Sequence, residues 1–173
     1  GWPVLGLLAR LAGTLFVRRH WREARRQRDA LAARLRAGES FVLFAEGTSS
    51  PGLDVLPLKT SLLSVAEPWV LERPVAVQPV VVAYRRLACG TPIDARNAGL
   101  YAWWGEATLL PHLWRLLQRE GVEVMVEIGE PVVSWSVRSR KLLGAELRAR
   151  LRAGLAAARN QMELGDETLA AVA

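Results

Sequence analysis

One short loop in the first third of the chain carries the residue types best suited to chemistry. It follows the apolar stretch 41–44 and consists of Glu46, Gly47, Thr48, Ser49 and Ser50. Loops at the ends of strands are where α/β folds place their ligands. Glycine lets the backbone approach a ligand, while hydroxyls and free N–H groups can bind an oxyanion. A surface turn closed by its own hydroxyl side chains is an equally good interpretation of these residues taken alone.

Four segments, in the right order, resemble motifs of the 1-acylglycerol-3-phosphate acyltransferase family. The run Phe44-Ala45-Glu46-Gly47-Thr48-Ser49-Ser50 resembles the family's Phe-Pro-Glu-Gly-Thr-Arg-Ser. Residues 13–19 resemble its Gly-x-x-Phe-Ile-Asp-Arg, residues 57–60 its Pro-Phe-Lys-x, and residues 77–80 its Val-x-Pro-Val. The stretch 101–131 resembles bacterial members that include lyso-ornithine lipid acyltransferases. Four ordered matches are far more specific than one loop.

The resemblance implies an enzyme that moves a fatty acyl group from acyl-CoA or acyl carrier protein to a lysolipid hydroxyl. The expected acceptor is 1-acylglycerol-3-phosphate, which would give phosphatidate in phospholipid biosynthesis. Lyso-ornithine lipid is the alternative acceptor, and a non-catalytic lipid- or phosphate-binding domain is the alternative from another class. The co-substrate aside, the resemblance implies no cofactor and no metal.

The family's general base is a histidine held by an aspartate in a His-x-x-x-x-Asp motif. Neither histidine of the chain fits this motif, because His20 is followed five positions on by Arg25, and His112 by Leu117. We therefore expect the motif upstream of Gly1, no catalytic residue within the chain, and no activity from the 173 residues alone. His20 is expected to belong to a basic patch and His112 to a helix.

The same resemblance implies a set of residues that bind the acceptor: Arg19, Glu46, Gly47, Thr48, Ser49 and Lys59. Arginine suits a phosphate because its planar group offers several donors in a fork. Three positions depart from the family's motifs, with Arg18 in place of aspartate, Ala45 in place of proline and Ser49 in place of arginine. The last change removes a cation, which an acceptor without a phosphomonoester, such as lyso-ornithine lipid, needs less.

The elements that must position this loop alternate between strands and helices, which predicts an α/β fold. The resemblance makes it a single glycerolipid-acyltransferase-like domain over residues 1–163, with a central, mostly parallel sheet flanked by helices and a frayed tail at 164–173. The mostly apolar stretch 76–84 likewise predicts a sheet covered on both faces. The expected strands are 14–18, 40–44, 76–84 and 122–128, and Pro79 requires an edge, a bulge or a strand end within the third. The expected helices are 3–12, 21–36, 60–67, 109–120 and 141–162.

Charge and aromatic residues bear on the partners. Residues 18–36 hold eight arginines and two acids, a local excess equal to the net charge of +6 for the whole chain. This region is expected to face anionic lipid, a phosphorylated ligand or solvent, whereas nucleic acid is not an expected partner, since no recognised binding motif accompanies it. Trp103 and Trp104 could line an acyl channel or meet the bilayer interface, while core packing is expected for Trp114. The implied location is the cytoplasmic face of the inner membrane.

Overall fold

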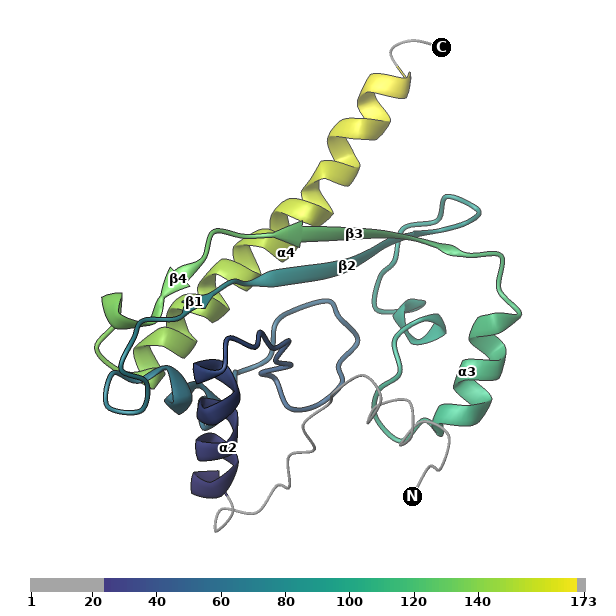
Figure 1. Ribbon diagram of the computed structural model, residues 1–173. Helices are drawn as coiled ribbons and strands as arrows, with labels where there is room; N and C mark the ends of the chain where they lie inside the picture. The colour runs from purple at the N-terminus through teal and green to yellow at the C-terminus, as the bar shows by residue number, and fades with distance from the viewer. Residues whose placement is uncertain (1–23, 171–173) are drawn as a thin grey trace. The chain divides into compact units, whose positions relative to one another are not determined.

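The computed structural model describes residues 24–170, and it divides the chain into two units, residues 1–40 and 41–173. The described part of the first unit is helix α2, Ala24–Arg36, which agrees with the helix predicted at 21–36 (Figure 1).

Helix α2 is closed by a glycine two residues after its end. Gly38 adopts a φ of 88°, which L-residues with side chains rarely adopt. Its N–H donates to the Leu35 carbonyl, and the next N–H, of Glu39, donates to the Arg34 carbonyl. These two bonds are those of a Schellman motif, which satisfies carbonyls at the end of a helix. The Arg34 guanidinium also donates a 2.8 Å hydrogen bond to the Glu39 carboxylate.

The second unit is built on an antiparallel ribbon of two small sheets. Strand β2, Val80–Leu87, pairs with β3, Val122–Ile128, and β1, Ala76–Val77, pairs with β4, Val132–Val133. Pro79 separates β1 from β2, as expected of a residue without an N–H, and its carbonyl accepts a 2.9 Å hydrogen bond from Gly129. The ribbon therefore bends at Pro79 while its two halves remain continuous.

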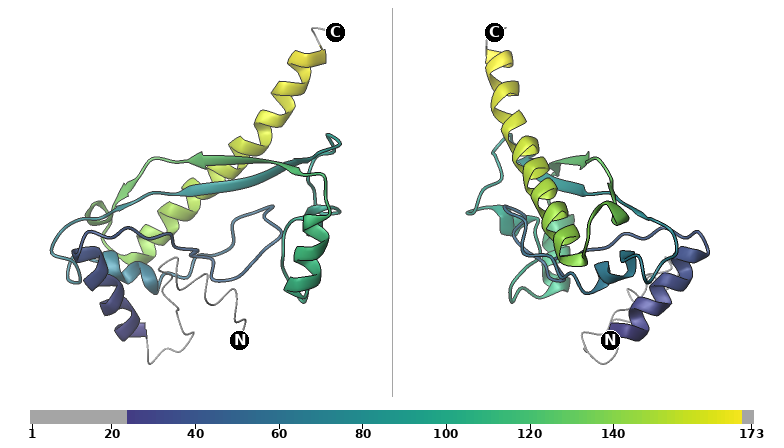
Figure 2. Two further views of the ribbon diagram at one scale, coloured as in Figure 1. Left: turned by 45° about the vertical axis from the view of Figure 1, so that its right-hand side comes forward. Right: turned by 90° about the vertical axis from the view of Figure 1, so that its left-hand side faces the viewer.

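Helix α4, Arg140–Ala170, lies against one face of β2 and β3 (Figures 1 and 2). Val81 and Ala83 of β2 point toward it and are buried with Leu155 and Ala158 of the helix. The strands alternate, so β2 and β3 turn a second set of large side chains the other way. These side chains are substantially exposed: Val80, Val82, Tyr84, Val124, Val126 and Ile128.

A 3-10 helix, η2 at Leu62–Ala66, packs beside the beginning of α4 and forms a second small core with it. Gly144 makes this approach possible, because a Cβ there would lie 2.6 Å from Cγ2 of Thr60. Leu63 and Ala66 of η2 are buried with Leu143 and Leu147 of α4. This packing joins the loop that precedes η2 to the C-terminal helix.

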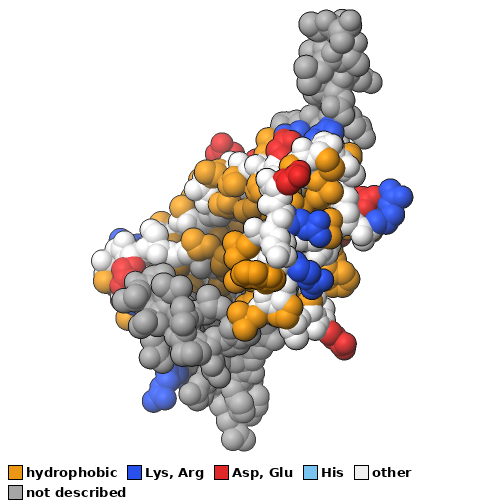
Figure 3. All heavy atoms as spheres, turned by 90° about the vertical axis from the view of Figure 1, so that its right-hand side faces the viewer, with side chains coloured by type: hydrophobic (Ala, Val, Ile, Leu, Met, Phe, Trp, Pro, Cys, Tyr) orange, Lys and Arg blue, Asp and Glu red, His pale blue; other side chains and the backbone are white. Residues whose placement is uncertain are grey.

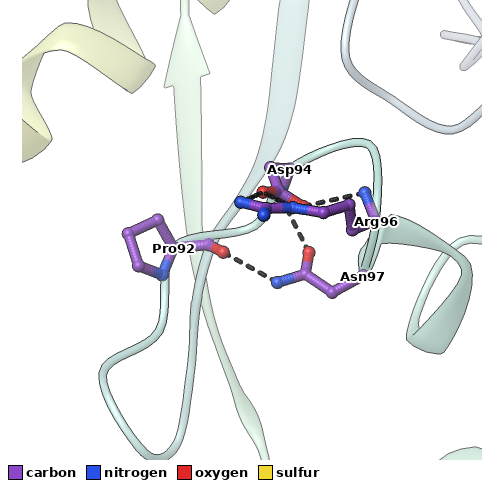
Figure 4. A network of polar contacts seen from close by, with 4 residues as sticks. All are labelled: Pro92, Asp94, Arg96 and Asn97. Atoms are coloured by element: carbon purple, nitrogen blue, oxygen red, sulfur yellow. Dashed lines mark hydrogen bonds and ion pairs between the residues drawn. The ribbon is translucent and has the colours of Figure 1, made fainter.

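Between β2 and β3 the chain leaves the ribbon, forms the 3-10 helix η3, Ala98–Leu100, and then helix α3, Leu109–Leu117. A polar network fixes the start of this excursion (Figure 4). The Asn97 amide donates to the Pro92 carbonyl at 2.8 Å and accepts from the Asp94 N–H at 2.8 Å. The Arg96 guanidinium binds the Asp94 carboxylate and holds the pKa of that carboxyl below its usual value. Residues 92–97 thus form a defined turn before η3.

The structure corrects three expectations about the sheet. The described strands pair antiparallel, so the central, mostly parallel sheet is not seen in residues 24–170. Residues 40–44 form no strand, and the expected strand at 14–18 lies outside the described residues, as does the helix at 3–12. The face of β2 and β3 opposite α4 is exposed, whereas the apolar strand predicted a sheet covered on both sides.

The helical predictions fare better. Helix α3 and the first part of α4 confirm the helices predicted at 109–120 and 141–162, and η2 lies within the segment predicted at 60–67. Helix α4 continues to Ala170, beyond its predicted end. Among the helices that the structure describes, none combines the length and apolar character needed to cross a bilayer.

Candidate functional site

The loop that carries the predicted site forms a tight turn. The Gly47 N–H donates a 3.1 Å hydrogen bond to the Phe44 carbonyl, and Gly47 adopts a φ of 66°. Only glycine takes this left-handed conformation without steric cost. The glycine of the motif is therefore required by the backbone itself, whatever the loop binds.

The structure brings Lys59 to this turn from twelve positions beyond Gly47. The Lys59 N–H donates a 2.6 Å hydrogen bond to the Ala45 carbonyl. A Cβ built on Gly47 would lie 3.1 Å from Cγ of Lys59, so the lysine stem passes directly under the glycine. The segments 44–50 and 57–60, which the sequence motifs marked separately, thus meet through the backbone and the aliphatic stem of Lys59.

Glu46 lies partly buried in this turn, and its ionisation reflects its position. Burial raises the pKa of the Glu46 carboxyl, and the negative charge of Asp54 raises it further. A backbone hydrogen bond from Leu56 and the positive charge of Arg148 oppose these effects. Desolvation is the largest cause, so the carboxylate is held in a drier environment than a surface glutamate.

The hydroxyl residues of the loop remain open to solvent. Thr48 and Ser49 are exposed, and Ser50 accepts a 3.2 Å hydrogen bond from the Gly52 N–H through its Oγ. That last bond is the local turn which the alternative interpretation of the sequence predicted. The exposed Thr48 and Ser49 remain available to a ligand that approaches the turn.

Arginines of helix α4 hold the far side of the loop. Arg148 donates to the Val55 carbonyl through Nη2 at 2.9 Å, and its Nε lies 3.2 Å from the carbonyls of both Val55 and Leu56. Arg152 binds the Asp54 carboxylate at 2.9 Å. Hydrogen bonds from a charged donor are stronger than neutral ones, and here they satisfy carbonyls that no strand partner reaches. Helix α4 therefore fixes the loop in which Glu46 lies.

Arg148 and Arg152 were not among the residues predicted for the site. Their signal was present, because Arg148 and Arg152 are four residues apart on a predicted helix and so share one face. What the sequence could not supply was the loop that this face contacts, almost a hundred residues earlier.

Other predicted residues lie elsewhere. Arg19 and His20 are outside the described residues, so the structure does not place Arg19 relative to Glu46. His112 lies buried on α3, with its Nε2 3.4 Å from the Tyr101 carbonyl, in agreement with its prediction as a helix residue. Trp114 contradicts its prediction, since it is 65% exposed rather than packed in a core. In the part of the chain that the structure describes, no three histidine, cysteine or acidic residues gather as metal ligands would.

Comparison with known proteins provides independent information on the family. Residues 1–83 match the model of the family described as "Acyltransferase". Three curated relatives, each named lyso-ornithine lipid O-acyltransferase, are similar over most of the chain. The protein from Brucella abortus is 41% identical, with 91% of this chain and 60% of the relative covered. The protein from Rhodobacter capsulatus is 36% identical, with 89% of this chain and 54% of the relative covered. The protein from Rhizobium meliloti is 38% identical, with 87% of this chain and 57% of the relative covered.

The chain thus spans between half and two thirds of the length of these relatives. No solved structure matches it significantly. The matched family region contains the Glu46 turn and Lys59, and the similarity to the relatives continues well past it. Residues 1–83 therefore carry a match to the acyltransferase family model, and the chain is similar over most of its length to proteins named lyso-ornithine lipid O-acyltransferase.

Proposed function

We propose that the protein transfers a fatty acyl group from a thioester donor to the free hydroxyl of a lysolipid, and that this acceptor is lyso-ornithine lipid. The observation that carries the proposal is the 41% identity, over 91% of this chain, to a protein named lyso-ornithine lipid O-acyltransferase. The motif loop agrees with it, because Ser49 stands where the resembling family has a phosphate-binding arginine. The acceptor first expected from the motifs, 1-acylglycerol-3-phosphate, is the competing candidate.

The reaction requires a base, an acceptor site and a leaving thiolate. The histidine of the His-x-x-x-x-Asp motif that the resemblance implies removes the proton from the acceptor hydroxyl in this proposal. The oxygen attacks the thioester carbonyl, an ester bond forms, and the carbon–sulfur bond breaks. The thiolate then leaves and takes up the proton. Acyl-CoA or acyl carrier protein supplies the acyl group, and no other cofactor enters the proposal.

The described residues contribute the acceptor site. The turn at Glu46 and Gly47 shapes the pocket, and Lys59, which lies under Gly47, provides a cation for the polar head of the acceptor. Arg19 supplies a second cation in the proposal. Arg148 of helix α4 holds the loop in place. The turn is therefore already ordered before the acceptor binds, and binding need not reorganise it. Because lysolipids reside in membranes, the site works at a membrane surface, which we place at the cytoplasmic face of the inner membrane.

The experiment that tests the proposal is an acyl-transfer assay on the full-length protein. Lyso-ornithine lipid is incubated with acyl-CoA or with acyl carrier protein, and mass spectrometry follows the diacylated product. Lysophosphatidate and lysophosphatidylcholine are tested in parallel as acceptors. Acylation of lyso-ornithine lipid above both others supports the proposal. Efficient acylation of lysophosphatidate alone would make the protein a phosphatidate-forming enzyme instead, and stable lipid binding without transfer by either donor would favour a non-catalytic domain.

A further inference from the structure

Helix α3 presents its apolar side to solvent. Leu110, Trp114 and Leu117 have exposed fractions of 61%, 65% and 71%, and Leu113 is exposed as well. The helix buries only His112, with Leu109 and Leu116 half-buried beside it. An amphipathic helix of a globular protein ordinarily turns its apolar stripe to the core. Here the apolar stripe faces outward. Single exposed leucines are ordinary on a protein surface, but a contiguous exposed stripe indicates a binding surface.

The outward side chains form one continuous surface. Residues 110, 113, 114 and 117 follow the spacing i, i+3, i+4 and i+7, so they line a single side of the helix. Trp103 and Trp104 precede this stripe and are exposed, and Trp103 donates a 2.6 Å hydrogen bond to the Ala107 carbonyl just before the helix begins. Figure 3 shows hydrophobic side chains gathered on this side of the molecule. We call this the tryptophan–leucine surface: Trp103, Trp104, Leu110, Leu113, Trp114 and Leu117.

The tryptophan–leucine surface is held in place by the fold. Tyr101 stacks on Tyr84 of β2, with ring centroids 6.2 Å apart, and its hydroxyl bonds the Gly121 carbonyl. Tyr101 also belongs to a small core with Ile93 and Ala98, and Leu116 of α3 packs against this core. The turn at 92–97 fixes the entry to this region (Figure 4). The exposed tryptophans and leucines are therefore presented by ordered elements.

The charged groups beside the surface offset one another, because Arg115 and Arg119 are positive while Glu106 and Glu120 are negative. Helix α3 contains no acidic residue, and its one charged residue is Arg115. A hollow of about 380 Å³ at its C-terminal end is lined by Arg115, Arg119 and Glu120 among others, an excess of one positive charge. Figure 3 shows both basic and acidic side chains around the hydrophobic ones. The aliphatic part of an arginine side chain can lie along an apolar surface while its guanidinium group reaches a phosphate.

We propose that the tryptophan–leucine surface is a docking site for the lipid bilayer, with α3 lying in the plane of the interface. Helices with Trp and Leu on one side and basic residues beside them insert their apolar side at the boundary of headgroups and acyl chains. Tryptophan is enriched at that depth because its ring is amphipathic. The inference rests on the proposed function in one respect, because a lysolipid acceptor is what brings the protein to a bilayer.

The composition of the surface predicts the character of its binding. Six large apolar side chains, beside charged groups that sum to zero, make the adsorption mainly hydrophobic. Its strength should therefore change little between low and high salt, whereas adsorption through an arginine patch such as that of residues 18–36 weakens steeply as salt rises. Vesicles of zwitterionic phosphatidylcholine should bind the protein through this surface.

The test is co-flotation of the full-length protein with phosphatidylcholine vesicles. The test variant is Trp114→Ala/Leu117→Ala, and the matched control is Trp69→Ala/Leu142→Ala. Trp69 is 70% exposed and Leu142 53%, so the same side chains are removed from positions off the surface. The test variant should bind vesicles at least about tenfold more weakly, since burial of one such side chain is worth more than one decade of affinity. The control should bind like the parent protein.

Other outcomes overturn the proposal. Equal vesicle binding by the two variants means that the bilayer does not contact this surface. Loss of thermal stability in the test variant with unchanged vesicle binding assigns the surface to another segment of the same protein. A change from dimer to monomer in light scattering, again with unchanged vesicle binding, assigns it to a second copy.

A turnover assay separates failure of this inference from failure of the proposed function. A short-chain, water-soluble lysolipid should be acylated equally by the parent protein and the test variant, because its delivery needs no bilayer. The acceptor embedded in vesicles should be acylated more slowly by the variant alone. A parent protein that binds vesicles through the surface but acylates neither acceptor contradicts the proposed function and leaves the docking site standing.

Discussion

Removing the guanidinium group of Arg148 should loosen the loop that carries Glu46. Arg148→Met keeps the length of the aliphatic stem and deletes the donors to the carbonyls of Val55 and Leu56, at 2.9 and 3.2 Å. Hydrogen bonds from charged groups contribute about 1.5–3 kcal/mol, and the half-buried position of Arg148 places the expected loss at about 2 kcal/mol. For a domain of this size such a loss lowers the Tm by roughly 4–8 °C.

Urea unfolding followed by circular dichroism measures this loss, with Arg152→Met as the matched control. Arg152 lies one turn further along α4 and reaches the same loop, but its ion pair with Asp54 is exposed on both sides. Exposed ion pairs contribute about 0.2–1 kcal/mol, so the control should lose far less than the test variant. Acyl transfer should fall in parallel for Arg148→Met, since the turn at Glu46 loses its support.

Two results would refute the reasoning. A free energy of unfolding for Arg148→Met within about 0.5 kcal/mol of the parent would mean that the carbonyls find water at no cost. Equal losses in Arg148→Met and Arg152→Met would mean that charge, rather than the hydrogen bonds to the backbone, holds the loop on the helix.

Three further predictions concern single positions. Gly144→Ala should cost about 1–2 kcal/mol in urea unfolding, because its Cβ meets Cγ2 of Thr60 at 2.6 Å, and Thr60→Ser in the same molecule should restore most of it; a stabilised single variant would contradict this packing. Because burial raises the pKa of Glu46, its ionised form costs stability above the folded pKa and none below the unfolded value of about 4.3. Glu46→Gln should therefore raise the Tm at about pH 8 and change it little near pH 3.5, and a uniform shift would show that ionisation is not the cause. Ser49→Arg should increase the kcat/KM for lysophosphatidate relative to that for lyso-ornithine lipid, and an unchanged ratio would mean that position 49 does not contact the head group.

Local patterns predicted the helices well and the sheet poorly. The apolar spacing within α2 and α4, and the glycine Gly38 after α2, act over a few residues, so they can be recognised in the sequence. Strand direction depends on which distant segment pairs with which, and nothing in the alternation of 122–128 indicates that its partner runs antiparallel. Pro79 was the exception, because the missing N–H is a local property that ended the strand where expected.

The candidate site was predicted in the same uneven way. The turn around Gly47 and the lysine beside it follow from two short motifs, and the structure brings the motifs together. The support from Arg148 depends on a contact across almost a hundred residues, which no motif encodes. Trp114 was misplaced because a tryptophan on a helix normally packs inward, and the sequence alone does not tell which side of α3 meets the core.

Competition between acceptors in a single reaction tests the central claim most directly. The full-length protein receives an acyl donor with equimolar lyso-ornithine lipid and lysophosphatidate in mixed micelles, and mass spectrometry quantifies both products at low conversion. The ratio of initial product amounts equals the ratio of the two kcat/KM values. If the central claim holds, the ratio lies well above one in favour of acylated ornithine lipid. A ratio below one, or no product from either acceptor, would contradict it.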